Sequence, residues 1–166
     1  MSTPFQRRLL IPRRPLNRPL YRQPRILACI IAGGALGTTA RHLIETRWGA
    51  APGEFPWATF SINITGSFLL GVLLTVLSLA GPDTGLRRTV RVTVGTGVLG
   101  GFTTYSTFIL EANTLARGGE LGLAAMYTAS SVALGICAAT LGFLAARAMW
   151  LRHPARTPKT TQIVGE

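Results

Sequence analysis

Hydrophobic residues along the chain gather into four long stretches without a charged side chain: residues 26–40, 55–82, 92–110 and 121–146. A helix that spans a bilayer needs about 20 apolar residues. The last three stretches are long enough alone, and the first is long enough if its helix continues past Arg41 to about Ile44. The polar faces at helical spacing that mark a soluble bundle are almost absent. The pattern predicts an all-α membrane protein with four transmembrane helices.

The charged residues lie mostly between these stretches and are unequal in sign, with 17 Lys and Arg against 6 Asp and Glu. Fourteen of the 17 basic residues fall before the first stretch, between the second and third, or after the fourth. With four spans, these regions share one side of the membrane, and the positive-inside rule makes that side the cytoplasm. We therefore expect a multi-pass plasma-membrane protein with both termini in the cytoplasm, and we expect no nucleic-acid partner.

The two ends of the chain differ from its apolar centre. Residues 1–25 combine seven arginines with five prolines, a composition typical of a disordered segment that also contacts anionic lipid. We divide the chain into this basic cytoplasmic tail, a membrane domain over residues 26–150, and a cytoplasmic C-terminal tail over residues 151–166. Cys29 and Cys137 lie in apolar stretches, where we expect them to be buried packing residues.

The third stretch carries the most informative sequence, GGFTTYSTF over residues 100–108. Glycine pairs weaken a helix, and threonine hydroxyls compete for its backbone groups. Lipid supplies no hydrogen bonds, so broken backbone is tolerated there only where protein or water covers it. We expect the third helix to break in mid-membrane around residues 100–104 and to expose carbonyls of the kind that coordinate alkali cations. On residue types alone, a kinked helix with aromatic packing remains open.

Aromatic and polar side chains in and near this motif are suited to bind an anion weakly. Tyr105 and Phe108 are three residues apart and share a helix face. The positive edge of an aromatic ring can face an anion without holding it too tightly to leave. Further donors stand at Asn63, Ser106, Thr107 and Tyr127, and Ser131 shares a helix face with Tyr127.

Two other features allow more than one interpretation. Arg41, near the end of the first stretch, either reaches the membrane interface or attracts anions to a pore mouth. Residues 95–100 match the dinucleotide-binding pattern GxGxxG, but no strand precedes them, so we expect these glycines to allow a tight helix crossing. The chain shows no nucleophile–base set and no metal-ligand cluster, and an enzyme is not expected.

The motif at residues 100–108, with Glu111 one turn on, resembles the signature of the CrcB/Fluc family of fluoride channels. Gly33-Gly34-x-x-Gly37 with Arg41 is similar to that family's first helix, and Asn63-x-x-Gly66-Ser67 to its second. The similarity covers roughly residues 26–150. It implies an antiparallel dimer of four-helix subunits with two narrow pores, through which fluoride passively leaves the cytoplasm so that its toxicity falls.

The resemblance also implies roles for individual residues. The backbone carbonyls of Gly100 and Thr103 match those that hold a central, structural sodium ion at the dimer interface. Tyr105 and Phe108 match the aromatic residues of the fluoride path, although the family usually has phenylalanine at the first of these positions. The other implied matches are the pathway residues Asn63, Ser106, Tyr127 and Ser131, with Arg41 as a vestibule charge.

The charge count bears on the dimer. An antiparallel homodimer needs one chain to insert both ways, yet this chain has fourteen basic residues on one side and three elsewhere. We therefore expect one orientation and a partner homologue of opposite orientation.

Two rival functions remain. A small proton-coupled exporter would need a carboxylate within a span, for which Glu111, placed at the end of the third helix, is the nearest candidate. A non-transporting subunit would need only small-residue helix contacts.

Overall fold

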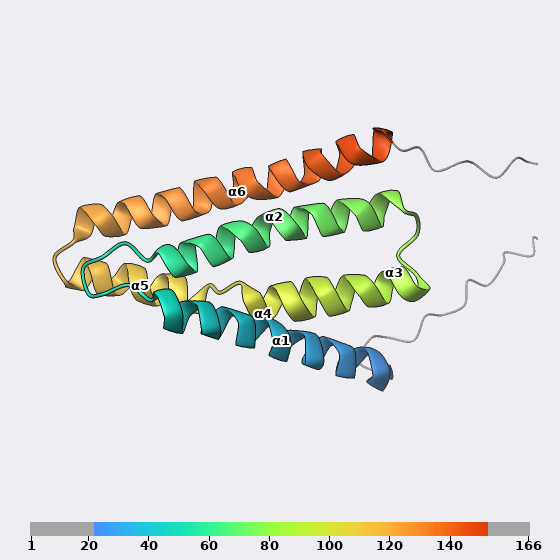
Figure 1. Ribbon diagram of the computed structural model, residues 1–166, viewed down its shortest axis with the longest axis horizontal. Coiled ribbons are helices and arrows are strands. Elements are labelled where there is room, and N and C mark those ends of the chain that lie inside the picture. Colours follow the sequence, from blue (N-terminus) through green and yellow to red (C-terminus); the bar gives the residue numbers. More distant parts are fainter. Residues whose placement is uncertain (1–21, 153–166) are drawn as a thin grey trace, which may run out of the picture.

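The computed structural model describes residues 22–152, which form a bundle of helices (Figure 1). The all-α prediction is confirmed, because no strand occurs within that range. Three of the helices are long and apolar enough to cross a membrane: α1 (Pro24–Trp48), α2 (Trp57–Leu79) and α6 (Leu121–Arg152). The two basic tails expected at the ends of the chain fall almost wholly outside the described residues.

The third stretch is divided into shorter elements. The helix α3 (Gly85–Val90) leads into the π-helix η2 (Arg91–Leu99) and then into α4 (Gly100–Phe102). The helix α5 (Ser106–Arg117) begins after an interruption at residues 103–105. Thr103 has extended backbone angles (φ −77°, ψ 153°), so the helical hydrogen-bond ladder stops there. These elements together run between the same two ends of the bundle as α1, α2 and α6 (Figure 1).

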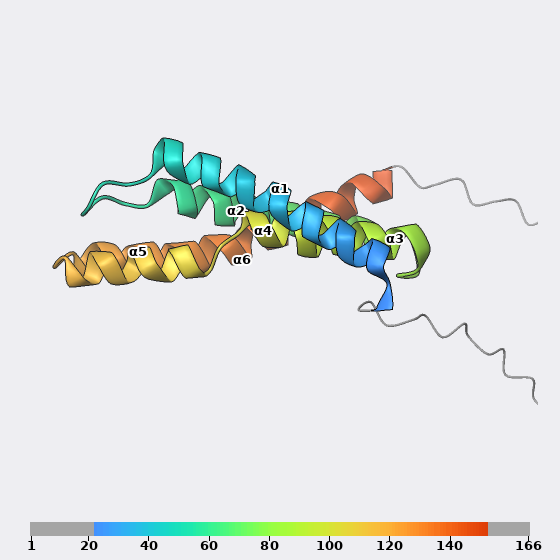
Figure 2. The same ribbon diagram turned by 90° about the horizontal axis from the view of Figure 1, so that it is seen from below.

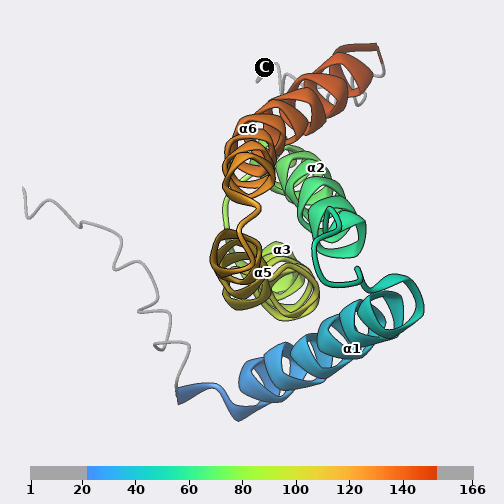
Figure 3. The same cartoon turned by 90° about the vertical axis from the view of Figure 1, so that its left-hand side faces the viewer.

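The helices surround the interruption. Viewed end-on, α6, α2 and α1 form an arc, and the segment from α3 to α5 lies on its inner side (Figure 3). The helix α1 packs on η2 and α4, whereas α6 packs on α2 and α5. In the view of Figure 2, α1 and α6 cross near α4. The interruption therefore lies where side chains from α1, α2 and α6 can all approach it.

Glycines allow two close helix crossings. Where α1 meets η2, a Cβ atom on Gly97 would lie 2.8 Å from the carbonyl oxygen of Ile30, so only glycine fits. Where α2 meets α6, a Cβ atom on Gly142 would collide with the carbonyl oxygen of Phe68. Gly97 belongs to the GxGxxG pattern, which lies in η2 and α4, and no strand precedes it from residue 22 onward. The expectation that this pattern serves a helix crossing is therefore confirmed at Gly97.

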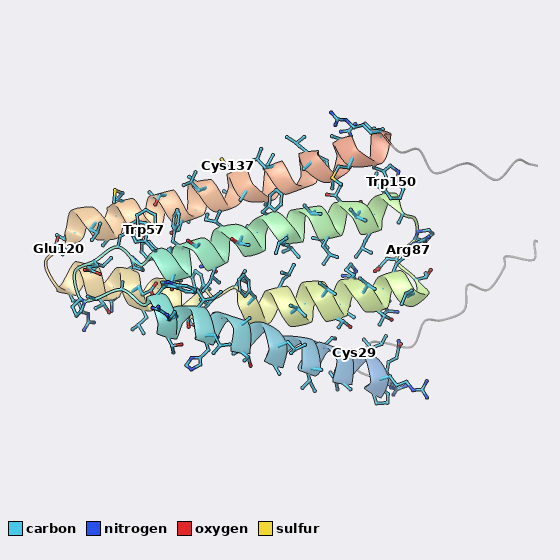
Figure 4. The ribbon with its side chains drawn as sticks, viewed as in Figure 1. Cys29, Trp57, Arg87, Glu120, Cys137 and Trp150 are labelled. Carbon is cyan, nitrogen blue, oxygen red and sulfur yellow. The ribbon has the colours of Figure 1, made fainter. Side chains whose placement is uncertain are left out.

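The outer faces of the long helices are apolar and exposed. Leu36 on α1 and Ile136 on α6 are 69% and 65% exposed. Cys29 and Cys137 are exposed too, and Cys137 lies on the outer side of α6 (Figure 4). The expectation that these cysteines are buried packing residues was wrong, because an apolar side chain on a membrane helix can equally well face lipid.

Several basic segments share one end of the bundle. The start of α1, the helix α3 with the beginning of η2, and the end of α6 all lie there (Figure 1). Arg87 and Trp150 mark this end, whereas Trp57 and Glu120 lie toward the opposite end (Figure 4). The described basic residues of these segments are Arg22, Arg25, Arg87, Arg88, Arg91, Arg147 and Arg152.

Candidate functional site

The backbone at the centre of the interruption is held by a side chain from α2. The Asn63 Nδ2 group donates to the Thr104 carbonyl at 2.9 Å, and the Thr104 N–H donates to Asn63 Oδ1 at 2.9 Å. Thr104 is only 8% exposed, so water has little access to these groups. Buried backbone groups need hydrogen-bond partners. The Asn63 amide supplies the donor and the acceptor that the interrupted helix no longer provides to Thr104.

Threonine hydroxyls satisfy the two new helix ends. The N–H and the hydroxyl of Thr103 both donate to the Leu99 carbonyl, each at 2.9 Å, which closes the end of α4. At the start of α5, the Thr104 hydroxyl accepts the Thr107 N–H at 3.2 Å and lies 3.3 Å from Ser106 Oγ. The first N–H groups of a helix lack partners within it, so the hydroxyls in the motif stabilise the break that they favour.

Three carbonyl oxygens at the interruption receive no such partner. Within the described range, no hydrogen bond reaches the carbonyl oxygen of Gly100, Phe102 or Thr103. The neighbouring carbonyls of Leu99, Gly101 and Thr104 each accept at least one. Unwound backbone carbonyls of this kind suit an alkali cation. No group of three or more His, Cys, Asp or Glu side chains that could hold a metal ion occurs in residues 22–152.

A groove of about 370 Å³ opens beside the interruption. It brings together predicted site residues from α2, the third stretch and α6, namely Asn63, Gly100, Thr103, Tyr105, Phe108 and Ser131. The Ser131 Oγ atom is buried and has no hydrogen-bond partner among the described residues. Its hydroxyl can therefore donate to a small polar ligand in the groove.

The two aromatic residues of the groove differ in exposure. Phe108 is 7% exposed and packs on Tyr127 with ring centroids 5.2 Å apart. Tyr105 is 76% exposed, and its ring centroid lies 6.2 Å from that of Phe108 with the planes tilted by 43°. Phe108 is thus anchored within the bundle, whereas Tyr105 extends from it. Nothing within the described chain covers most of the Tyr105 ring.

Tyr127, Ser106 and Arg41 do not line this groove. Tyr127 is fully buried, and its hydroxyl donates to Glu111 Oε2 at 2.7 Å. Ser106 lies against the Thr104 hydroxyl. Arg41 contacts the Gly101 carbonyl and the Thr107 hydroxyl, each at 3.3 Å, with Nε and Nη1. The structure therefore places three of the predicted site residues around the interruption but outside the groove.

Sequence reasoning missed the half-buried position of Glu111 between α2 and α6. The helix α5 continues to Arg117, so placing Glu111 at the end of the third helix was wrong. Both carboxylate oxygens accept hydroxyl hydrogen bonds, from Tyr127 on α6 and from Thr59 on α2 at 2.8 Å. The available signal was spacing, because Glu111 lies three residues after Phe108 and four before the buried Leu115, on the same helix face.

The chain is similar to a defined family and to curated ion channels. Residues 28–143 match the family described as CrcB-like protein, Camphor Resistance (CrcB). The chain is 41% identical over 128 residues to Fluoride-specific ion channel FluC 1 of Cutibacterium acnes, covering 77% of this chain and 90% of that protein. It is 43% identical over 133 residues to FluC 2 of Nocardia farcinica, with 80% and 91% covered. It is also 43% identical over 132 residues to FluC of Chlorobium luteolum, with 80% and 96% covered.

Proposed function

Because the chain belongs to the CrcB-like family, whose relatives described above are ion channels rather than enzymes, we propose that it is a fluoride-selective passive channel. It would export fluoride from the cytoplasm and lower its toxicity there. The groove at the helix interruption carries this proposal, because it gathers an amide, an unpartnered hydroxyl and two aromatic rings on one surface. Fluoride is strongly hydrated, so a selective path must replace its water with fixed donors.

The groove residues take different parts in this path. The Ser131 hydroxyl has no partner within the described chain and donates to the ion. Phe108 and Tyr105 offer the positive edges of their rings, which attract an anion weakly enough for it to leave. Asn63 uses one N–H of its amide on Thr104, and an amide nitrogen carries a second. That second N–H is available to the ion, so Asn63 both holds the interruption and lines the path.

We propose four membrane crossings: α1, α2, the segment from α3 to α5, and α6. The length and hydropathy of α1, α2 and α6 support three of them. The divided third segment runs between the same ends of the bundle and contains the charge-free residues 92–110. The basic residues at one end support, by the positive-inside rule, an orientation with both termini in the cytoplasm. The interruption then lies within the bilayer, where protein must cover it.

The exposed part of the groove supports an antiparallel dimer. Tyr105 is 76% exposed, and a second subunit would cover its ring and close the path from outside. The carbonyl oxygens of Gly100 and Thr103, which accept no hydrogen bond within the described chain, would hold a structural sodium ion. A bound cation there would offset the repulsion between anions. The one-sided charge makes the partner an oppositely oriented homologue rather than a second copy of this chain.

Fluoride efflux from liposomes tests the channel and the dimer together. Vesicles would carry this chain alone, or this chain with a homologue of opposite Lys/Arg bias, and chloride efflux would serve as the ion control. We expect rapid fluoride efflux only with the pair, no chloride efflux, and a single orientation of this chain when its termini are mapped. Fluoride efflux with the pair no faster than from empty vesicles would refute the channel. Mixed orientation with full efflux from this chain alone would refute the unequal pair.

A proton-coupled exporter is the second candidate, and the position of Glu111 favours it. The carboxylate lies inside the bundle between Thr59 and Tyr127, as a proton-binding acid would. It does not line the groove, however. The channel predicts fluoride flux that does not change when a proton gradient is imposed, and Glu111→Gln would not uncouple it. An exporter predicts flux driven by the gradient and uncoupled by that substitution.

A further inference from the structure

Arg41, on α1, contacts the interrupted helix on both sides of the interruption. Its Nε group donates to the Gly101 carbonyl at 3.3 Å, and its Nη1 group donates to the Thr107 hydroxyl at 3.3 Å. Gly101 belongs to α4, before the interruption, and Thr107 to α5, after it. One guanidinium on α1 therefore contacts both half-helices. The planar, forked guanidinium suits two acceptors at once.

The Gly101 carbonyl needs a donor from another element. The helical ladder stops after Phe102, so this carbonyl lies in the last turn of α4, where carbonyls lack helical partners. Arg41 supplies one donor, and the Thr38 hydroxyl approaches the same oxygen at 3.4 Å. A Cβ atom on Gly101 would lie 2.5 Å from the Gly34 carbonyl oxygen. The glycine crossing thus brings α1 close enough for Arg41 to reach the interruption.

The charge of Arg41 is engaged away from the groove. Glu45, one turn along α1, lies 3.6 Å from its Nη1 atom, and only about a fifth of each side chain is exposed. Arg41 is not among the residues that line the groove. An anion in the groove would therefore meet the interruption from the side that Asn63 holds, whereas Arg41 contacts it from the α1 side.

We propose that Arg41 is a positioning residue that clasps α4 to α5 across the interruption and sets the separation of the two half-helices, rather than a cation that attracts the permeating ion. Asn63 holds Thr104 between them, so the interrupted segment is fixed from both sides. The effect on transport rests on the proposed channel function, whereas the clasp itself does not. Arg41 affects transport indirectly, because it helps to fix the positions of Tyr105 and Phe108 beside the path.

Hydrogen exchange of the intact protein tests the clasp without fluoride. Arg41→Gln removes the fork, and Arg41→Lys keeps the charge but replaces the fork with one ammonium. Because hydrogen bonds to charged groups are among the stronger ones, we expect both variants to speed amide exchange over residues 101–107 by at least about tenfold. Arg47→Gln is the matched control, because Arg47 is exposed near the end of the same helix. It should leave that exchange unchanged.

Variants at the acceptor remove the clasp from its other side. Thr107→Val removes the hydroxyl at nearly constant volume, and Thr107→Ser retains it. We expect faster exchange over residues 101–107 in the valine variant and near wild-type exchange in the serine variant. The Thr107 hydroxyl also accepts from the Thr104 hydroxyl at 3.1 Å, so the pair tests the acceptor as a whole, and it does so even if Arg41 variants fail to fold. Equal exchange in the two Thr107 variants would overturn the clasp.

Transport at different ionic strengths separates positioning from attraction. Salt screens a cation that draws ions toward a pore, so an attracting Arg41 predicts that raising the salt shrinks the gap between wild type and Arg41→Gln. The clasp predicts the same fold loss at low and high salt, in Arg41→Lys as well as Arg41→Gln. Full transport and slow exchange in Arg41→Lys would overturn it. If the wild type carries no fluoride, the channel proposal fails, and the exchange results still judge the clasp.

Discussion

The pairing of Asn63 with Thr104 gives the sharpest test of how the interruption is stabilised. Asn63→Ala removes one donor and one acceptor, both 2.9 Å from backbone groups of a residue that is 8% exposed. An unpaired buried polar group costs about 1–3 kcal/mol, so two would cost about 2–6 kcal/mol. Asn63 lines an open groove, and water entering there would recover part of this. We expect the free energy of unfolding to fall by about 2–4 kcal/mol.

The measurement is denaturant unfolding in detergent, followed by circular dichroism, together with fluoride efflux from liposomes. Asn113→Ala is the matched control, because Asn113 is exposed and accepts only a 3.3 Å hydrogen bond from Arg117. It should change the unfolding free energy by less than about 0.5 kcal/mol. Asn63→Asp keeps the acceptor but turns a second oxygen toward the Thr104 carbonyl, so it should be as damaging as alanine. Wild-type stability and efflux in Asn63→Asp would refute the two-way pairing.

Three further predictions concern other parts of the bundle. Gly142→Ala would press a Cβ atom against the Phe68 carbonyl and should lower the free energy of unfolding by about 1–3 kcal/mol. In the control Gly122→Ala the new Cβ atom has no atom within 4 Å, so the free energy of unfolding should stay equal or rise. Similar losses in both variants would contradict this account. Tyr127→Phe removes the donor to Glu111 and should cost about 1.5–3 kcal/mol in the same assay. Tyr105→Phe is the control, because this residue is 76% exposed, and it should cost less than about 0.5 kcal/mol. Equal losses in Tyr127→Phe and Tyr105→Phe would contradict a stabilising hydrogen bond between Tyr127 and Glu111. The hydrogen bond from Arg91 lowers the pKa of Asp83 below its ordinary value of 3.8, so this pair stabilises the fold above that value and the contribution is lost as the pH falls through the lowered pKa. Thermal unfolding of Asp83→Asn should therefore show a shallower acid-side fall than the wild type, and superimposable acid profiles would argue against it.

The polarity pattern predicted the long helices because membrane insertion depends on the composition of each segment. The stretches beginning at residues 26, 55 and 121 correspond to α1, α2 and α6. Their ends were less predictable. The helix α1 extends to Trp48, past Arg41 and Glu45, which lie 3.6 Å apart and are each only about a fifth exposed. The length of a charge-free stretch can therefore be shorter than the helix that contains it, as it is for residues 26–40 and α1.

The candidate site was predicted in part. The glycines and threonines of residues 100–108 indicated a weak point in the helix, and the interruption lies at residues 103–105. The sequence did not indicate that Asn63 would pair with Thr104, or that Glu111 would accept from Thr59 and Tyr127. Each of these pairs joins different elements of the chain. Their contact depends on how closely the helices cross, which no local pattern records.

The sequence by itself predicted the class of protein, the long apolar helices and the place of the interruption at residues 103–105, and it contains the uneven distribution of basic residues. These properties depend on solvation and on local backbone preference, which act within a few neighbouring residues. Only the tertiary structure decided which carbonyls at the interruption are paired, which donors face the groove, and that Arg41 contacts both half-helices. Those outcomes depend on hydrogen bonds between separate elements. Such bonds form only between atoms within about 3.5 Å of each other, and close crossings at glycines bring helices far apart in the chain to that distance.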